Sequence, residues 1–156
     1  MSRGFVRAAV AVLAVVVAAA GCASMKKVSA EEAIAARQQL MKEQGAAAQA
    51  IGDKLKAGNA NIAAEAHKLV ETSQRIPTLF PEGSLNPQTS RAKPEIWQKW
   101  SEFEGNAKTL NTKAGQLEAM AKSGATAQAL APAMQDLGRT TCGACHNTFR
   151  GPEIKK

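Results

Sequence analysis

The chain has 156 residues, enough for one compact domain. It contains four Phe, two Trp and no Tyr, and no stretch alternates polar and β-branched residues as a strand would. Its formal net charge is +7, from 20 basic and 13 acidic residues. The basic residues are scattered without interleaved aromatics, which argues against nucleic-acid binding. The lack of strand-like alternation favours an all-α domain.

The first 21 residues have the pattern of a secretory signal peptide. Arg3 and Arg7 precede an apolar run over residues 8–20, which is followed by small residues. The run is short for a membrane span, which needs about 20 apolar residues. We therefore expect residues 1–21 to be removed on export to the periplasm.

Cys22 follows Ala-Ala-Gly, a pattern that resembles a bacterial lipoprotein box with Cys22 as the lipidated first residue. Ala19 stands where such boxes most often have Leu. The alternative is ordinary cleavage at a nearby small-residue site, which leaves a soluble protein. A lone thiol in an oxidising compartment tends to pair between chains, so lipidation is favoured. Residues 22–29 would then tether the domain to a membrane.

Two helices are predicted in the first half of the mature chain. Residues 30–57 begin after a capping box of Ser29 and Glu32. The apolar face of this first helix recurs every seven residues and comprises Ile34, Met41, Ala48 and Leu55. Residues 61–75 predict a second helix, which Pro77 ends.

Two more helices are predicted in the second half. Residues 94–122 predict a third helix with Pro94 in its first turn. Residues 126–149 predict a fourth, in which Pro132 introduces a kink or marks the true start. The inward face of the fourth helix is expected to comprise Ala127, Leu130, Met134, Leu137, Thr141, Ala144 and Thr148, with Cys145 and Phe149 adjacent.

Residues 76–93 form a long crossover between the second and third helices. Three prolines forbid a regular helix there, and we expect Leu79 and Phe80 to pin the segment to the core. Four amphipathic helices in residues 30–150 predict an antiparallel four-helix bundle, with a C-terminal tail over residues 151–156. Alanine fills many core positions, so the bundle either packs very closely or leaves a gap that a flat apolar cofactor could fill.

The stretch TTCGACHNTF near the C-terminus carries the chemistry. Cys142, Cys145 and His146 form Cys-x-x-Cys-His, the attachment signature of c-type haem. Two thiols at this spacing can bond to the two vinyl groups of one haem, and the adjacent imidazole can then reach the iron. The sequence therefore predicts one covalent haem c.

Three other interpretations of this cluster remain. A structural zinc site needs four ligands, and Cys142, Cys145 and His67 supply three, with His146 awkwardly placed. A redox dithiol would usually accompany a βαβ unit, and a structural disulfide would leave His146 without a role. Export favours haem, because haem is attached outside the cytoplasm.

A C-terminal CxxCH on the fourth helix of an Ala-rich bundle resembles the class II cytochromes c, the cytochrome c' family. The stretches ARQQLMKEQG, IPTLFPEGS, PEIWQKWSEFE and CGACHNTFR carry the resemblance, which extends in order from Ser29 to Arg150. The lipoprotein-like start is not part of the usual family pattern. The resemblance implies a haem c bundle, and a homodimer as one assembly, since members often pair through their first two helices.

The resemblance also implies a sixth iron ligand. One branch of the family leaves that position empty, and the low-spin branch fills it with a methionine from the first helix. QLMKEQG resembles the low-spin branch and places Met41 there. From its spacing alone, Met41 is more readily a core residue, since methionine commonly fills gaps in a core. Met134 lies 12 residues before His146 on the same helix, about 18 Å away, and Met120 and Met25 are also poorly placed.

Arg37 and Arg150 are one helical turn from Met41 and His146, respectively, and the resemblance points to both as partners of the haem propionates. Each could equally be a solvated side chain.

With His146 and Met41 on the iron, the expected function is single-electron transfer with redox partner proteins, and not enzymatic catalysis. The alternative is a five-coordinate protein that binds NO or CO where Met41 does not hold the iron.

Overall fold

The computed structural model describes residues 28–154. The predicted signal peptide, Cys22 and Met25 fall outside these residues. Between residues 28 and 154, no helix combines the length and apolarity that a membrane crossing requires.

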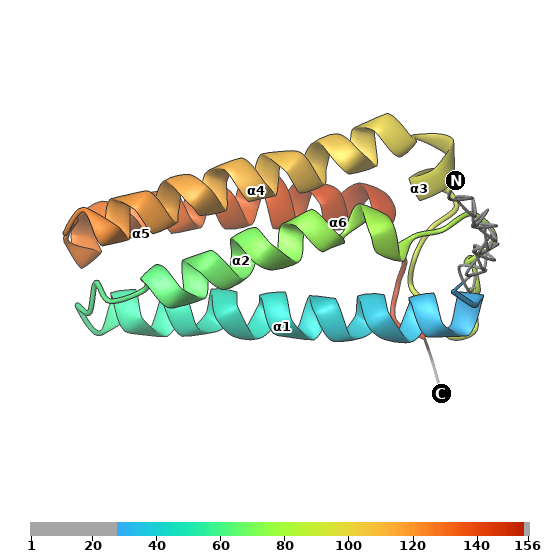
Figure 1. Ribbon diagram of the computed structural model, residues 1–156, viewed down its shortest axis with the longest axis horizontal. Coiled ribbons are helices and arrows are strands. Elements are labelled where there is room, and N and C mark those ends of the chain that lie inside the picture. Colours follow the sequence, from blue (N-terminus) through green and yellow to red (C-terminus); the bar gives the residue numbers. More distant parts are fainter. Residues whose placement is uncertain (1–27, 155–156) are drawn as a thin grey trace, which may run out of the picture.

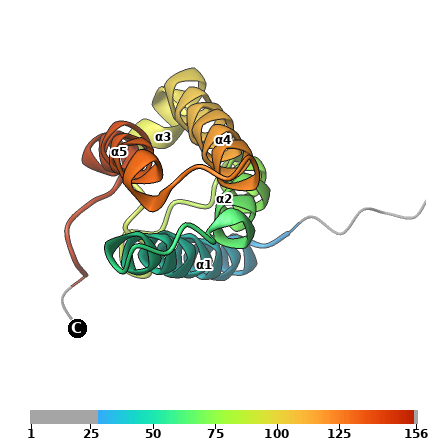
Figure 2. The ribbon, with the colours of Figure 1, turned by 90° about the vertical axis from the view of Figure 1, so that its left-hand side faces the viewer.

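The described residues fold into a four-helix bundle (Figures 1 and 2). The first three helical rods are α1 (Ala30–Lys56), α2 (Ala63–Arg75) and α4 (Trp100–Lys122). The fourth rod is continuous but has three parts: α5 (Ala127–Leu137), the π-helix η2 (Gly138–Gly143) and α6 (Ala144–Phe149). Residues 28–154 contain no β-strand, only an isolated bridge between Ala92 and Arg150. The predicted all-α bundle is confirmed.

Helix α1 begins as its sequence predicts. The backbone N–H of Glu32 donates to Ser29 Oγ at 3.1 Å, and that of Ser29 donates to Glu32 Oε2 at 2.9 Å. Its buried side is centred on Leu40 and Ile51. Of the predicted seven-residue face, Ile34 is buried, whereas Met41, Ala48 and Leu55 are half-buried at the edge of the core.

The crossover and the third predicted helix meet in an aromatic cluster. Phe80 is buried, as expected, and the Trp97 indole donates to the Phe80 carbonyl at 3.1 Å. Trp97 lies in a short helix, α3 (Glu95–Gln98), and the non-helical backbone of Lys99 (φ −120°, ψ 44°) separates α3 from α4. The prediction of one unbroken helix over residues 94–122 is therefore wrong at Lys99.

The last helical rod changes register before the cysteines. Its start is Ala127, capped by Thr126, and Pro132 lies inside α5, so Pro132 is not the start. The i→i+5 bonding of η2 inserts one residue into the turn. The buried face therefore shifts by one residue.

This shift overturns part of the predicted inward face of the fourth helix. Phe149 is buried and Cys145 faces inward, whereas Ala144 is exposed and Thr148 is half-exposed. The prediction that Ala144 and Thr148 continue the core face is wrong. The π-helix aligns Leu137, Thr141, Cys145 and Phe149, which step by four residues.

Candidate functional site

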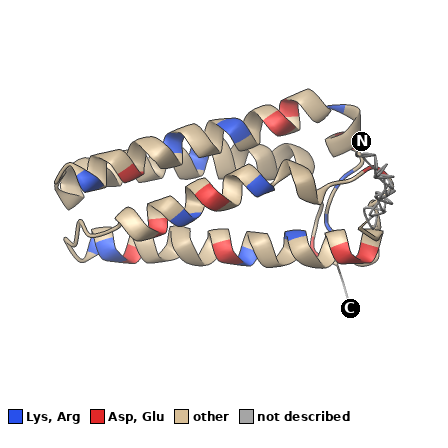
Figure 3. Ribbon diagram, viewed as in Figure 1, with Lys and Arg blue, Asp and Glu red and all other residues tan. Residues whose placement is uncertain are grey.

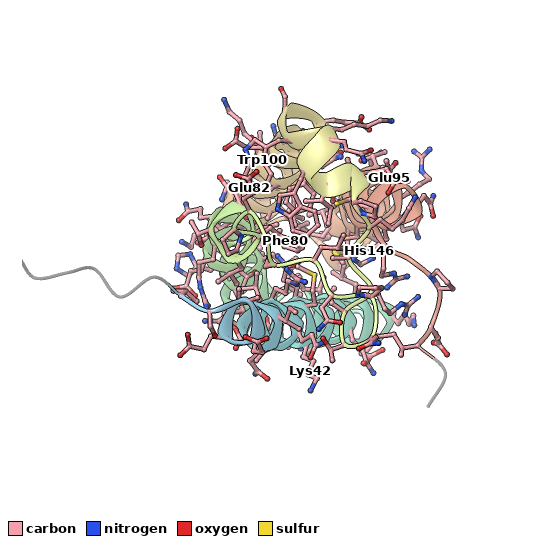
Figure 4. The ribbon with its side chains drawn as sticks, turned by 90° about the vertical axis from the view of Figure 1, so that its right-hand side faces the viewer. Lys42, Phe80, Glu82, Glu95, Trp100 and His146 are labelled. Carbon is pink, nitrogen blue, oxygen red and sulfur yellow. The ribbon has the colours of Figure 1, made fainter. Side chains whose placement is uncertain are left out.

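A cavity of about 700 Å³ opens between α1, the crossover, α4 and the η2–α6 segment. Its apolar walls include Met41, Ile76, Phe80, Ile96, Phe103, Ala107, Leu110 and Phe149. Phe80 and His146 lie in the space between α1 and the helices opposite (Figure 4). A gap is therefore present, although most of its apolar lining is Phe, Ile, Leu and Met rather than the alanine that suggested it. Its volume is typical of a cofactor pocket.

The three residues of the CxxCH motif line one wall of this cavity. Cys142 and Cys145 are free thiols and half-buried. Burial, and then the neighbouring Cys142, raise the pKa of Cys145 to about 11, so its thiol is protonated at neutral pH. Burial, and secondarily the charges of Arg150 and Arg91, lower the pKa of His146. The imidazole is therefore neutral at pH 7 and keeps a lone pair for a metal ion.

Backbone contacts with the crossover hold the end of α6 in place. The backbone N–H of Lys93 donates to the Phe149 carbonyl at 3.1 Å, and Lys93 Nζ donates to the Thr148 carbonyl at 2.9 Å. Gly151 N–H donates to the Arg91 carbonyl at 2.7 Å, and Arg91 Nε donates to the Gly151 carbonyl at 2.9 Å. The motif is thus fixed relative to residues 91–93, far away in sequence.

Met41 lies in α1, across the cavity from the motif. It is half-buried, packs against the core and lines the cavity. Met120 and Met134 also pack against the core, but neither lines the cavity. Met41 is thus the one methionine of the described residues that the structure brings together with His146.

Arg37 is a buried cation on the cavity wall, with 3% of its surface exposed. Its guanidinium donates to Ser84 Oγ (3.0 Å), the Ser84 carbonyl (2.9 Å) and Ser90 Oγ (2.8 Å), and lies 4.8 Å from the centre of the Phe80 ring. No carboxylate of residues 28–154 forms an ion pair with it, and burial lowers its pKa. An anionic ligand in the cavity would supply the missing negative charge.

Arg150 is exposed and also lines the cavity, directly after α6. Its backbone N–H donates to the His146 carbonyl at 3.1 Å. Its position allows it to meet an acidic group at the mouth of the cavity. Ser84 and Ser90 were not predicted as part of the site, because they lie 47 and 53 residues from Arg37 and no local pattern marks them.

His67 does not join the cysteines. It lies on α2, where Nδ1 is 3.1 Å from Glu118 Oε1 and Nε2 is 3.6 Å from Glu71 Oε1. Across residues 28–154, no three His, Cys, Asp or Glu side chains lie close enough together to hold a metal ion. The zinc interpretation that needed His67 therefore has no support from the structure.

The residues around the cavity fit a haem c. Two free thiols and a neutral imidazole share one wall, and the rest of the lining is mainly apolar. The amide nitrogen of Gln44, which lines the cavity, is buried and has no hydrogen-bond partner among the described residues. Gln44 and Arg37 are therefore donors that haem carboxylates could satisfy.

The comparisons with known proteins agree with this fit. The sequence model of the family described as Cytochrome C' matches residues 32–150. This chain belongs to the cytochrome c' family. Family members bind one covalent haem c, so the cofactor predicted from Cys142, Cys145 and His146 is confirmed at the level of the family.

Individual relatives cover most of the bundle. Cytochrome c' of Pararhodospirillum photometricum is 36% identical over 92 residues, which are 59% of this chain and 72% of that protein. Cytochrome c-556 of Agrobacterium tumefaciens (strain II Chrys) is 33% identical over 119 residues, 73% of this chain and 93% of that protein. The crystal structure of cytochrome c' from Thermochromatium tepidum superimposes with a TM-score of 0.70 at 30% identity, covering 80% of this chain and 98% of the other.

Proposed function

We propose that this member of the cytochrome c' family carries single electrons, and that His146 and Met41 would both bind its haem iron. One observation carries the proposal: Met41 and His146 line the same cavity from different helices. Methionine together with histidine raises the reduction potential of haem iron, and two protein ligands leave no position for substrate.

The protein's residues have distinct tasks in this function. Bound haem would supply the one-electron redox chemistry. Cys142 and Cys145 would hold it through thioether bonds, and the apolar walls exclude water. Arg37 and Arg150 are proposed to face its propionates. Because η2 and the crossover fix the motif, the ligands need to move little when the charge of the iron changes.

The second candidate function is binding of a small gas at the sixth iron position. The family description favours it, and a solved neighbour at 24% identity, which establishes the fold alone, is a nitric oxide complex of an Alcaligenes xylosoxidans cytochrome c' variant. Gly45, one turn after Met41, lines the cavity, and a Cβ built there meets no atom within 4 Å. Gly45 thus places no side chain on the Met41 side of the cavity, which would suit a diatomic ligand if Met41 does not bind the iron.

The absorption spectrum of the haem-loaded protein tests the choice. We expect a low-spin oxidised spectrum with a weak far-red sulfur-to-iron band, and slow or incomplete binding of CO by the reduced protein. A high-spin, five-coordinate spectrum with rapid CO binding would instead establish the second candidate.

Export and assembly are proposals of the same kind. The pattern of residues 1–24 supports export to the periplasm with lipidation of Cys22. A cytochrome c' at 26% identity shows ligand-controlled dimer dissociation, which supports a homodimer here. Mass spectrometry of the mature protein should find one haem and a lipidated N-terminal Cys22; an unmodified N-terminus beyond residue 22 would refute the lipid anchor.

A further inference from the structure

Most cations of residues 28–154 have an acidic partner, and three of the five exceptions lie at one place. Side chains within 4.0 Å of a carboxylate belong to Lys54, Lys56, Lys68, Arg75, Arg91, Lys93, Lys113, Lys122 and Arg139. Five basic side chains of the described residues have no such partner, namely Arg37, Lys42, Lys99, Lys108 and Arg150. Three of these five line the haem cavity. Elsewhere, the positive and negative charges are interspersed over the helices (Figure 3).

Three exposed or partly exposed cations surround the cavity mouth, and we call Lys42, Arg91 and Arg150 the basic rim. They come from α1, the crossover and the end of α6, and all three line the cavity. Lys42 extends from α1 into solvent (Figure 4). The one carboxylate near Arg91 belongs to Glu153, 4.0 Å away and 91% exposed, and such a pair contributes little.

The haem itself does not cancel this charge. Two propionates and Glu153 supply three negative charges, whereas Arg37 and the basic rim supply four positive charges. Arg37 is buried, whereas Lys42 and Arg150 are exposed and Arg91 is partly exposed, so the excess positive charge lies at the mouth. The mouth of the cavity, through which an edge of the bound haem would be accessible, therefore keeps an excess of positive charge.

We infer that the basic rim docks an acidic one-electron redox protein at the mouth of the haem cavity. The inference rests on the proposed electron-transfer function. A positive patch around a redox site attracts a negative partner and orients it before the electron moves. A membrane surface fits less well, because lipid-binding clusters usually hold about 4–8 basic residues and the rim holds three.

The test is the rate at which small one-electron oxidants oxidise the reduced, haem-loaded mature protein in a stopped-flow instrument. Hexacyanoferrate(III) is the anionic oxidant and tris(1,10-phenanthroline)cobalt(III) the cationic one; each accepts one electron. With hexacyanoferrate, the rate should fall at least about threefold when ionic strength rises from roughly 10 to 150 mM, as screening shortens the reach of the rim charges. The rate with the cobalt complex should be constant or rise.

The variant Lys42→Glu tests whether the attraction of hexacyanoferrate depends on the basic rim, and Lys56→Glu is its matched control. Lys56 is also exposed, on the same helix, roughly 21 Å from Lys42 at 1.5 Å per residue. At low salt, Lys42→Glu should lower the hexacyanoferrate rate at least about threefold, whereas Lys56→Glu should change it less than about 1.5-fold. Poly-L-glutamate, standing in for an acidic protein surface, should slow the reaction of the wild type and not of Lys42→Glu.

Several results would overturn the inference. Rates independent of salt, or equal effects of Lys42→Glu and Lys56→Glu, would remove the rim as a docking surface. A third result would assign the rim to a membrane surface instead. In that case the protein sediments with phosphatidylglycerol vesicles, and Lys42→Glu weakens this sedimentation but leaves the hexacyanoferrate rate unchanged. A low-spin spectrum with either result leaves the proposed electron-transfer function intact, whereas a high-spin spectrum refutes that function whatever the rates show.

Discussion

Replacing both Cys142 and Cys145 by serine is expected to yield a chain without covalent haem that does not form a stable bundle. The cavity of about 700 Å³ would lose its occupant. Without the cofactor, apolar side chains such as Phe103, Leu110 and Phe149 would face water, at a cost that is a large part of the roughly 5–15 kcal/mol that stabilises a typical domain. The helices should therefore collapse into the gap or unfold.

Circular dichroism melting, together with extraction of pigment into acidified organic solvent, measures this outcome. The single variant Thr148→Ser is the control, because Thr148 lies on the same helix but does not line the cavity. It should keep its haem and melt like the wild type. If the double variant lacks haem but melts cooperatively at the wild-type temperature, the bundle does not need a cofactor in the cavity for its stability, and the prediction is wrong.

Replacing Met41 by leucine is expected to convert the oxidised haem from low-spin to high-spin and to open the iron to gases. Leucine and methionine have similar volumes, and such exchanges usually cost less than about 1.5 kcal/mol, so the bundle should persist. The affinity for CO should rise at least about tenfold, since a methionine–iron bond worth 1.4 kcal/mol suffices for that factor. The reduction potential should fall, because methionine ligation raises it.

Met134→Leu is the control for this variant. Met134 packs against the core without lining the cavity, so the same exchange there should change neither the spectrum nor the CO affinity. A Met41→Leu protein with the wild-type spectrum would show that Met41 only fills space and would favour the gas-binding function.

Local signals in the sequence predicted the parts of the structure that depend on neighbouring residues. The Ser29–Glu32 capping box formed as expected, because both partners lie within one turn. The spacing of Cys142, Cys145 and His146 predicted the cofactor for the same reason, since two thiols and an imidazole on adjacent turns fit one ligand.

Long-range contacts explain what the sequence did not show. A regular helical period predicted Ala144 and Thr148 on the inward face, but the π-helix η2 aligns Cys145 and Phe149 with the cavity instead. The break at Lys99 likewise lies inside a regular apolar pattern. Regular helical periodicity therefore fails at the site, where the ligands must fit a cofactor as well as a core.

The buried arginine is the clearest case. Arg37 was predicted as a partner of an acidic ligand from its place near Met41. Its actual hydrogen-bond partners, Ser84 and Ser90, lie in the part of the crossover that follows the 3-10 helix Pro77–Leu79 and has no helix or strand of its own. Only the folded chain brings them together.

X-ray absorption at the iron edge tests the assignment of Met41 most directly, because it reports the atoms bound to iron in the oxidised protein. We predict one sulfur atom among the nearest neighbours of iron in the wild type, and its loss in Met41→Leu but not in Met134→Leu. Nearest neighbours consisting only of nitrogen or oxygen in the wild type would contradict the His146–Met41 site and the electron-transfer function built on it.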